Sequence, residues 1–309
     1  MTKAAPPQAL QLLFKERANL LYRRKLQENL KSAFNKSTVY KFSRISKIDL
    51  SVIIVVHNHA EFTYDCLVSV WKNRFRGMEV IVVNNNSTDG TNDVLKMFSG
   101  ITVLNNNRNM HFNGGATQGA IAAHGKHLLF LNNDCRLYKN AIKSALSRIK
   151  KTSKVGIVGG RILNTDFSLQ EAGFLIAKQG VCIPLGYGDN PKNKKYLVSR
   201  KVSACSGAFL LTPKKLFMKL GGFPKMYAPA YLEDMHYCMQ VKKHGYSIVY
   251  EPKATLLHFR QASGNRDWAK KLILNNRKKF ISIWRDQLRL TWDKNDKLVK
   301  PDLHLYENL

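Results

Sequence analysis

From residue 50 onward, short apolar runs alternate with segments of helical pattern, and this alternation constrains the fold more than any other feature of the chain. Leu50–Val56 is an almost continuous β-branched run, which is typical of a strand covered on both faces. Further strands are predicted at Glu79–Val83, Ile101–Leu104 and His127–Leu131, with helices between them. Such strand–helix repeats predict an α/β fold with a mostly parallel central sheet flanked by helices, whose ligands bind at the carboxyl ends of the strands.

The pattern is less regular after Lys154. A strand is predicted at Val155–Leu163 and another across Val202–Leu211, the latter interrupted at residues 206–208. Residues 165–200 are predicted to form a polar loop region that faces a substrate. The remaining predicted elements are helices at 213–220 and 233–244, then strands at 247–250 and 254–258.

Positive charge is high at both ends of this 309-residue chain. The formal net charge is +29, residues 1–49 hold 11 Lys/Arg against 3 Asp/Glu, and residues 265–309 hold 11 against 6. We expect three parts: a basic amphipathic helical arm at 1–47, an α/β domain at 48–264 and a basic helical extension at 265–309. The charge indicates a nucleic acid, an anionic membrane surface or a polyanionic substrate as partner.

The arm is predicted to be helical from Gln8 to Phe34, because leucines recur at helical spacing beside arginines and lysines. Basic amphipathic helices often lie on membrane surfaces, although an ordinary helix packed on the domain has the same pattern. No apolar run approaches the roughly 18–20 residues that cross a bilayer, and residues 1–7 lack the apolar segment of a signal peptide. Five scattered cysteines without a C-x-x-C pair argue against a disulfide framework or a zinc site. We therefore expect a reduced, cytoplasmic chain.

Oxygen-bearing side chains follow the fourth predicted strand, at Asn132-Asn133-Asp134. Such a cluster at the carboxyl end of a strand suits Mg²⁺ or Mn²⁺, either of which can bridge the diphosphate of a ligand. The same three residues are also good turn formers, so the sequence leaves both interpretations open.

Two further positions carry candidate chemistry. Glu233 and Asp234 begin a predicted helix, where they can act as capping acids or as a base beside a group that holds an acceptor. His258 ends an apolar run, and a lone histidine there is more often structural. Close to Asp134, however, it would make a second metal ligand.

In this order, these clusters and several others resemble the family 2 glycosyltransferases of the GT-A fold. The most similar branch is the rhamnosyltransferase-like one that elongates bacterial cell-surface polysaccharides and lipopolysaccharides. The resemblance covers roughly residues 50–263, and its strength lies in the ordered set, since each motif alone is weak. The motifs are Ser51–Asn58, Val82–Thr91, Phe112–Gly119, Leu131–Asp134, Gln170–Gly173, Ser206–Ala208, Gly221–Phe223, Glu233-Asp234 and His258.

The resemblance implies a nucleotide-sugar half at about 48–135 and an acceptor half at 136–264. It implies that Asp134 and His258 hold a divalent metal, and that Asp234 is the catalytic base of an inverting, single-displacement transfer. The implied nucleotide-sugar-binding residues are Asn58, Asn84, Asp89, Asn113, Asn133 and Asp134. The implied acceptor-binding residues are Glu171, Ser206, Gly207 and Glu233.

The chain departs from the family pattern at several positions. Asn84 stands where the family usually has an Asp that accepts a hydrogen bond from the nucleobase, which puts the base identity in doubt. Asn132 replaces the first acid of the metal motif, His236 replaces an acid two residues after Asp234, and Thr117 replaces a frequent Asn.

A saccharide acceptor is expected, plausibly linked to polyprenyl diphosphate or another lipid. The basic flanks would then hold the enzyme as a peripheral protein on the inner face of the plasma membrane, although an anionic glycan is another use for the charge. A nucleic-acid-binding or polyanion-binding protein on an inactive scaffold is the main alternative, but no nucleic-acid-reading motif is found. A dinucleotide oxidoreductase lacks its G-x-G-x-x-G after the first strand, and a nucleotidyltransferase lacks its Gly-rich basic loop there.

Overall fold

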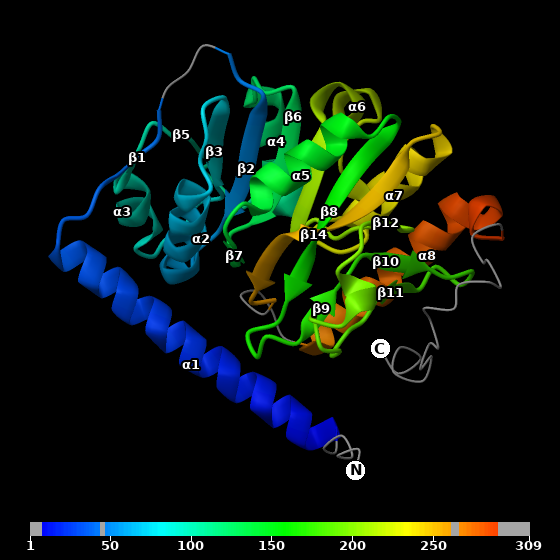
Figure 1. Ribbon diagram of the computed structural model, residues 1–309, viewed down its shortest axis with the longest axis horizontal. Coiled ribbons are helices and arrows are strands. Elements are labelled where there is room, and N and C mark those ends of the chain that lie inside the picture. The colour runs from blue at the N-terminus through cyan, green and yellow to red at the C-terminus, as the bar shows by residue number, and fades with distance from the viewer. Residues whose placement is uncertain (1–7, 44–46, 261–265, 290–309) are drawn as a thin grey trace.

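The computed structural model describes residues 8–43, 47–260 and 266–289 (Figure 1). Within these residues, ten strands form one central sheet. Its first half is parallel, with β6 (His127–Asn132), β2 (Leu50–Val56), β3 (Met78–Asn84) and β5 (Thr102–Asn105) in that spatial order. These strands agree with the predicted ones to within about two residues.

The second half of the sheet is mixed. β13 (Phe209–Pro213) runs antiparallel between β6 and β8 (Val155–Leu163), and β14 (Ser247–His258) pairs in parallel with β8. Three short strands add antiparallel pairs at the end of the sheet. They are β7 (Cys135–Leu137) and β12 (Arg200–Lys201), which pair with β14, and β9 (Leu169–Glu171), which pairs with β8.

Two predictions for this half were wrong. The two strands expected at 247–250 and 254–258 are one strand, because an irregularity in the pairing between Glu251 and Thr255 lets β14 continue past Pro252. Residues 165–200 are not simply a loop. They contain β9, the antiparallel pair β10 (Phe174–Ile176) and β11 (Cys182–Pro184), and the short 3₁₀ helix η1 (Lys194–Tyr196), because their scattered apolar side chains are buried against the sheet.

Helices cover both faces of the sheet (Figure 1). One face packs against α2 (Ala60–Lys72) and α5 (Ala141–Lys151), and the other against α4 (His111–Ala122), α6 (Lys214–Lys219), α7 (Glu233–Lys243) and α8 (Arg266–Arg289). The remaining elements are β1 (Tyr40–Lys41), α3 (Thr91–Lys96), β4 (Phe98–Ser99) and the 3₁₀ helix η2 (Lys225–Tyr227). Each fully buried aliphatic side chain in these layers contributes roughly 1.5–3 kcal/mol of transfer free energy.

Small residues let α4 lie close to the sheet. A Cβ added to Gly119 would lie 2.5 Å from Ile53 Cγ2, and one added to Gly115 would lie 2.7 Å from Val55 Cγ1. Both distances are far inside van der Waals contact, so larger residues at these positions would push α4 off β2.

The long helix α1 (Gln8–Asn35) extends along one side of the domain (Figure 1). It is docked through Leu26, which packs with Phe62 and Phe259, and through an ion pair of 2.7 Å between Arg23 Nε and Glu61 Oε1. The other side of α1 leaves Leu20 and Leu21 more than half exposed. The arm therefore packs on the domain, which was the second of the two arrangements left open by its sequence.

The helix α8, expected as part of a separate extension, also packs on the domain. Phe280, Trp284 and Leu288 are buried in the same core as α7. Among all helices whose residues the structure describes, none is long and apolar enough to span a bilayer.

Candidate active site

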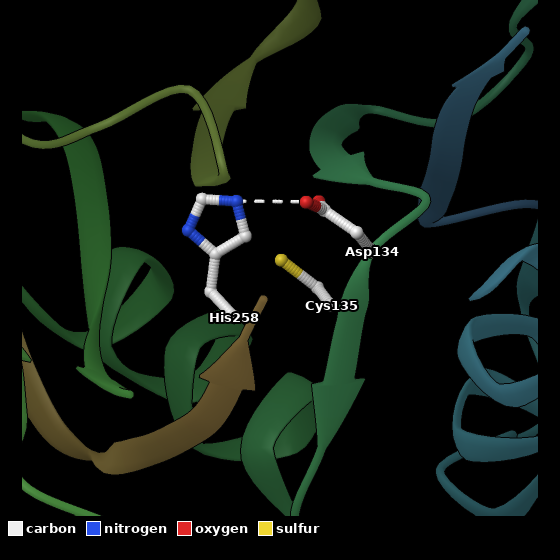
Figure 2. Close-up of side chains that lie close together, drawn as sticks. All are labelled: Asp134, Cys135 and His258. Atoms are coloured by element: carbon white, nitrogen blue, oxygen red, sulfur yellow. Dashed lines mark ion pairs between the residues drawn. The ribbon is translucent and has the colours of Figure 1, made fainter. Parts of the chain in front are cut away.

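Three side chains meet where β6 and β14 end and β7 begins (Figure 2). Asp134 lies in the tight turn between β6 and β7, and His258 is the last residue of β14. Pairing of β7 with β14 sets Cys135 opposite His258. The Asp134 Oδ1 atom then lies 3.2 Å from His258 Nε2. The structure thus brings together the two residues predicted as metal ligands, which are 124 positions apart in the sequence.

Gln170 on β9 fixes which ring nitrogen of His258 carries a proton. The Gln170 Nε2 atom donates to the backbone carbonyl of His258 at 3.2 Å, and a carbonyl can only accept. The Gln170 Oε1 atom must therefore be the one that faces His258 Nδ1, at 2.7 Å. Since an amide oxygen can only accept, Nδ1 carries the hydrogen, and a neutral ring has its lone pair on Nε2.

This tautomer sets the Nε2 lone pair against a carboxylate oxygen of Asp134. Two acceptors at 3.2 Å repel each other unless a proton or a cation lies between them. Burial works to raise the pKa of Asp134, but a doubly protonated His258 and the backbone N–H groups of Asp134 and Arg260 together lower it, so the carboxyl is ionised at neutral pH. An ionised carboxylate and an imidazole held by an outer hydrogen bond are a donor set that fits a divalent metal.

Cys135 is the third member of this group, and no motif or spacing in the sequence indicated it. Its Sγ atom lies 3.5 Å from the carbonyl oxygen of Ala208, to which it donates. Burial, with Asp134 next, raises the pKa of the Cys135 thiol well above its ordinary value. A protonated thiol is a poor ligand for hard cations, so Asp134 and His258 are the better matched pair for Mn²⁺ or Mg²⁺.

We predict that Gln170→Leu lowers the affinity for Mn²⁺ by about 10- to 100-fold, which is the usual cost of losing the outer partner of a metal-binding histidine. Gln170→Glu keeps an acceptor for His258 Nδ1–H and should lose less. The measurement is a Mn²⁺ titration of the protein alone, followed by electron paramagnetic resonance. Unchanged Mn²⁺ affinity in Gln170→Leu would show that Gln170 does not orient His258.

Asp234 is held at the start of α7 by two backbone hydrogen bonds. The N–H of Gly207 donates to Oδ2 and the N–H of Met235 donates to Oδ1, both at 2.8 Å. The two residues before the helix, Tyr231 and Leu232, have φ angles of 75° and 74°, a left-handed conformation that turns the chain sharply into α7. These contacts give the carboxylate a single orientation.

Asn276 on α8 fixes the segment that leads into this turn. Its Nδ2 atom donates to the backbone carbonyls of Tyr227, Ala230 and Tyr231 at 2.9–3.1 Å. No sequence pattern indicated that Asn276 holds this segment, because α8 was expected to lie outside the domain.

Three carboxyl groups lie together here, on the buried residues Glu171 and Glu233 and the half-buried Asp234. Burial raises the pKa of Asp234, although the Gly207 and Met235 N–H groups oppose the rise. Burial and the Asp234 charge raise the pKa of Glu233, whose Oε2 has no hydrogen-bond partner among the residues that the structure describes. Burial likewise raises the pKa of Glu171 to about 8, with Asp234 adding to the rise. Raised pKa values are typical of carboxyls that take up protons in catalysis.

The predicted acceptor residues Ser206 and Gly207 lie in the loop before β13 and contact these carboxyls. The backbone N–H of Ser206 donates to Glu171 Oε1 at 3.4 Å. A Cβ added to Gly207 would lie 3.5 Å from the Asp234 Cβ, so any side chain there would stand beside the carboxylate.

Three of the predicted nucleotide-sugar residues make their polar contacts within the protein. Asn58 Oδ1 accepts from the N–H of Thr88 at 2.8 Å, and Asp89 Oδ2 accepts from the N–H of Ala60 at 2.9 Å. These bonds join the loops that follow β2 and β3. The Asn84 side chain is 3% exposed, accepts from the N–H of Ser87, and donates to Asn92 Oδ1 and Asn105 Oδ1. All three residues therefore shape the two loops.

Besides Asp134, the two remaining predicted nucleotide-sugar residues also have internal partners. Asn113 is buried on α4 and its Nδ2 atom donates to the carbonyl of Pro224, while its Oδ1 has no partner within the described part of the chain. Asn133 donates to Thr63 Oγ1 at 3.1 Å, which ties the turn beside Asp134 to α2.

Comparison with known proteins decides the family. A model of glycosyl transferase family 2 matches residues 51–221, which is more than half of the chain and includes β2 through α6. The chain belongs to glycosyltransferase family 2. This confirms the resemblance drawn from the motifs.

Curated relatives of this family 2 glycosyltransferase include named sugar transferases. An N-acetylglucosaminyl-diphospho-decaprenol L-rhamnosyltransferase of Mycobacterium tuberculosis is 25% identical over 273 residues, covering 78% of this chain and 88% of that protein. Glycosyltransferase AglE of Haloferax volcanii is 26% identical over 207 residues, covering 65% of this chain and 64% of that protein. An uncharacterised protein of Sinorhizobium fredii is 24% identical and matches 84% of this chain, which spans only 29% of that protein's length.

Solved structures confirm the predicted GT-A architecture. GalNAc-T7, solved with UDP, GalNAc and Mn²⁺, matches with a TM-score of 0.63 at 16% identity, covering 80% of this chain and 50% of that one. The mannosyltransferase PcManGT of Pyrobaculum calidifontis, solved with GDP-Man and Mn²⁺, matches with a TM-score of 0.55 at 16% identity, covering 94% and 77%. At this identity the likeness concerns the fold alone.

Proposed function

We propose that this family 2 glycosyltransferase is a metal-dependent, inverting enzyme that moves a sugar from a nucleotide-diphosphate donor to a saccharide acceptor. The observation that carries the proposal is that the Asp134–His258 pair lies close to the carboxyls of Glu171, Glu233 and Asp234 at one end of the sheet. Gln170 contacts His258, its neighbour Glu171 accepts from the N–H of Ser206, and the N–H of Gly207 donates to Asp234. The Asp134–His258 pair and these carboxyls therefore form one continuous centre.

Asp134 and His258 would hold the metal, Mn²⁺ or Mg²⁺. When bound, such an ion offsets the negative charge that develops on a diphosphate leaving group. The two solved neighbours that contain Mn²⁺ support this choice of ion. On the protein side, Gln170 accepts from Nδ1–H of His258 and so leaves Nε2 as the ring nitrogen that faces the metal position, and the low pKa of Asp134 keeps its carboxylate ionised.

Asp234 would take the proton from the attacking acceptor hydroxyl. A buried carboxylate with a raised pKa is a stronger base than one in water, and the two N–H groups hold its oxygens in place. The hydroxyl then attacks the anomeric carbon as the bond to the diphosphate breaks, which inverts the configuration. Glu171, Ser206, Gly207 and Glu233 surround this base and would contact the acceptor.

The test of this function is a thermal-shift panel of UDP, dTDP, GDP and CMP sugars, with and without Mn²⁺. A donor present at 100 times its Kd should stabilise the fold by about 2.7 kcal/mol. We expect stabilisation by one nucleotide class, and only with the metal. Stabilisation by polyanions alone would overturn the proposal.

We further propose that the acceptor is lipid-linked and that the enzyme works at an anionic membrane surface. The name of the mycobacterial relative, a decaprenol-linked rhamnosyltransferase, supports the acceptor class. The exposed side of α1 carries Arg17, Arg24 and Lys31. Replacing them does not change Leu26, the buried residue through which α1 packs on the domain. Each well-placed Lys or Arg contributes about 1 kcal/mol of attraction to an anionic leaflet.

We predict that replacing Arg17, Arg24 and Lys31 together by Glu lowers binding to phosphatidylglycerol vesicles at least tenfold, measured by co-sedimentation at low salt. A control with Lys201, Lys215 and Lys219 changed to Glu has the same net charge and should bind like the unmodified protein. Equal loss in both variants would mean that total charge, rather than α1, governs membrane binding.

A further inference from the structure

An open cavity of about 480 Å³ lies against β8 and β14, outside the centre described above. Cationic and aromatic side chains dominate its wall, and among residues of described position no carboxylate lines it. The side chains concerned are Tyr138, Lys139, Arg161, Phe167, Lys192 and Lys253.

Arg161 on β8 is held in a fixed orientation in this wall. Its Nε and Nη2 atoms donate to Thr255 Oγ1 at 3.2 and 3.1 Å, and Nη1 donates to the carbonyl of Pro191 at 3.2 Å. Thr255 is fixed in turn, because its hydroxyl donates to the carbonyl of Pro252 at 2.8 Å. The acceptors are all neutral, so the guanidinium is oriented while its charge is left uncompensated.

The lysines in the wall likewise have no carboxylate partner among the residues that the structure describes. Within the described part of the chain, no ion pair joins Lys139, Arg161, Lys192 or Lys253 to a carboxylate. Four positive groups around one hollow create a potential that attracts an anion. The wider domain adds to it, since residues 50–264 hold 28 Lys/Arg against 12 Asp/Glu.

The aromatic residues indicate which kind of ligand bears the negatively charged group. Phe167 is 58% exposed and Tyr138 is 40% exposed, so both rings have free apolar surface. Aromatic rings beside a few oriented polar groups are typical of sites for small polar ligands with an apolar face, such as sugar rings. A flat lipid surface would not need a hollow of this size.

The cavity also has a fixed relation to the centre at His258. Thr255 and His258 lie on the same strand, three residues apart, which corresponds to about 10 Å. An odd spacing directs their side chains to opposite faces of β14. The cavity is therefore separate from the Asp134–His258 pair, but a saccharide of a few units could reach from the cavity to that pair around the end of β14.

We propose that this cavity binds an acidic saccharide unit, a sugar that carries a carboxylate or a phosphate, as a remote part of the acceptor. This assignment rests on the proposed function for its link to the acceptor, but binding itself does not require transfer. Arg161 would hold the anion with two N–H groups, and Phe167 or Tyr138 would contact the sugar ring.

The test is ligand-observed NMR with glucuronic acid, glucose 6-phosphate, glucose and inorganic phosphate, on metal-free protein without donor. We expect both acidic sugars to bind, and glucose to bind at least tenfold more weakly. Arg161→Ala should weaken binding of the acidic sugars at least tenfold, Lys253→Ala should weaken it less, and Lys219→Ala on α6, which does not line the cavity, should leave it unchanged. Melting temperatures identify any variant that fails to fold, and Arg161→Lys, which keeps the charge, serves as the milder replacement.

Failure of this proposal is distinguishable from failure of the proposed function. Asp234→Asn should bind the acidic sugars like the unmodified protein, whatever its transfer activity. Equal binding of acidic sugars to Arg161→Ala, or equal binding of glucose and glucuronic acid, would overturn the assignment. Inorganic phosphate binding as tightly as glucose 6-phosphate would reduce the cavity to an anion site without a sugar. Loss of binding to phosphatidylglycerol vesicles in Arg161→Ala, with sugar binding unchanged, would identify a lipid headgroup instead.

Discussion

Replacing Asp234 by Asn is expected to lower sugar transfer by about 10²- to 10⁴-fold, the range that a general base contributes. The amide keeps the size of the carboxyl but cannot take a proton from the acceptor. Donor binding should persist, because Asp234 is held by the N–H groups of Gly207 and Met235 and is not a member of the Asp134–His258 pair. The measurement is the transfer rate at saturating donor, beside donor affinity from the thermal shift.

Two controls accompany this variant. Asp93→Asn removes an exposed carboxylate that pairs with Lys96, and should leave transfer unchanged. The unmodified enzyme should lose transfer activity as the pH falls through the pKa of its base, and because burial raises the pKa of Asp234, this loss should begin above the ordinary range of an aspartate. Full turnover by Asp234→Asn would exclude Asp234 as the base.

Replacing Asp134 by Ala is expected to weaken Mn²⁺ binding by more than about 100-fold, since losing an inner ligand should cost more than the 10- to 100-fold of an outer partner. Asp134 is the ionised carboxylate of the pair, and its removal leaves one imidazole, which is a weak site alone. The metal-dependent stabilisation by donor, about 2.7 kcal/mol at 100 times Kd, should vanish with it.

The metal-free protein provides the control for this second variant. Asp134 and His258 face each other as two acceptors when neither a proton nor a cation lies between them, so Asp134→Ala should not unfold the protein above neutral pH. Its melting temperature without metal should stay near that of the unmodified chain. Donor affinity that is unchanged and still metal-dependent would show that the ion binds elsewhere.

Several elements could be predicted from the sequence because their signals are local. The β-branched run at β2 and the small residues of α4 define a buried strand and a closely packed helix within a few residues. The candidate residues Asp134, Asp234 and His258 could be selected from the sequence for the same reason. Each follows, begins or ends an element with a clear pattern.

Other features depend on residues that are distant in sequence. Gln170 belongs to a recognisable motif, but its effect on His258 requires β9 to lie beside the end of β14. The sequence of β14 shows Pro252 as a break, whereas the irregular pairing with β8 lets the strand pass it.

The sequence by itself determined the family, the parallel half of the sheet and the candidate side chains of the site, because those follow from local apolar patterns and from ordered motifs. Only the tertiary structure decided that α1 and α8 pack on the domain, since Leu26 and Phe280 find apolar partners more than 30 residues away. It also decided which His258 nitrogen is free and that Arg161 is oriented without a counterion. Hydrogen-bond direction and charge compensation are set by neighbours in space, and a linear pattern does not contain them.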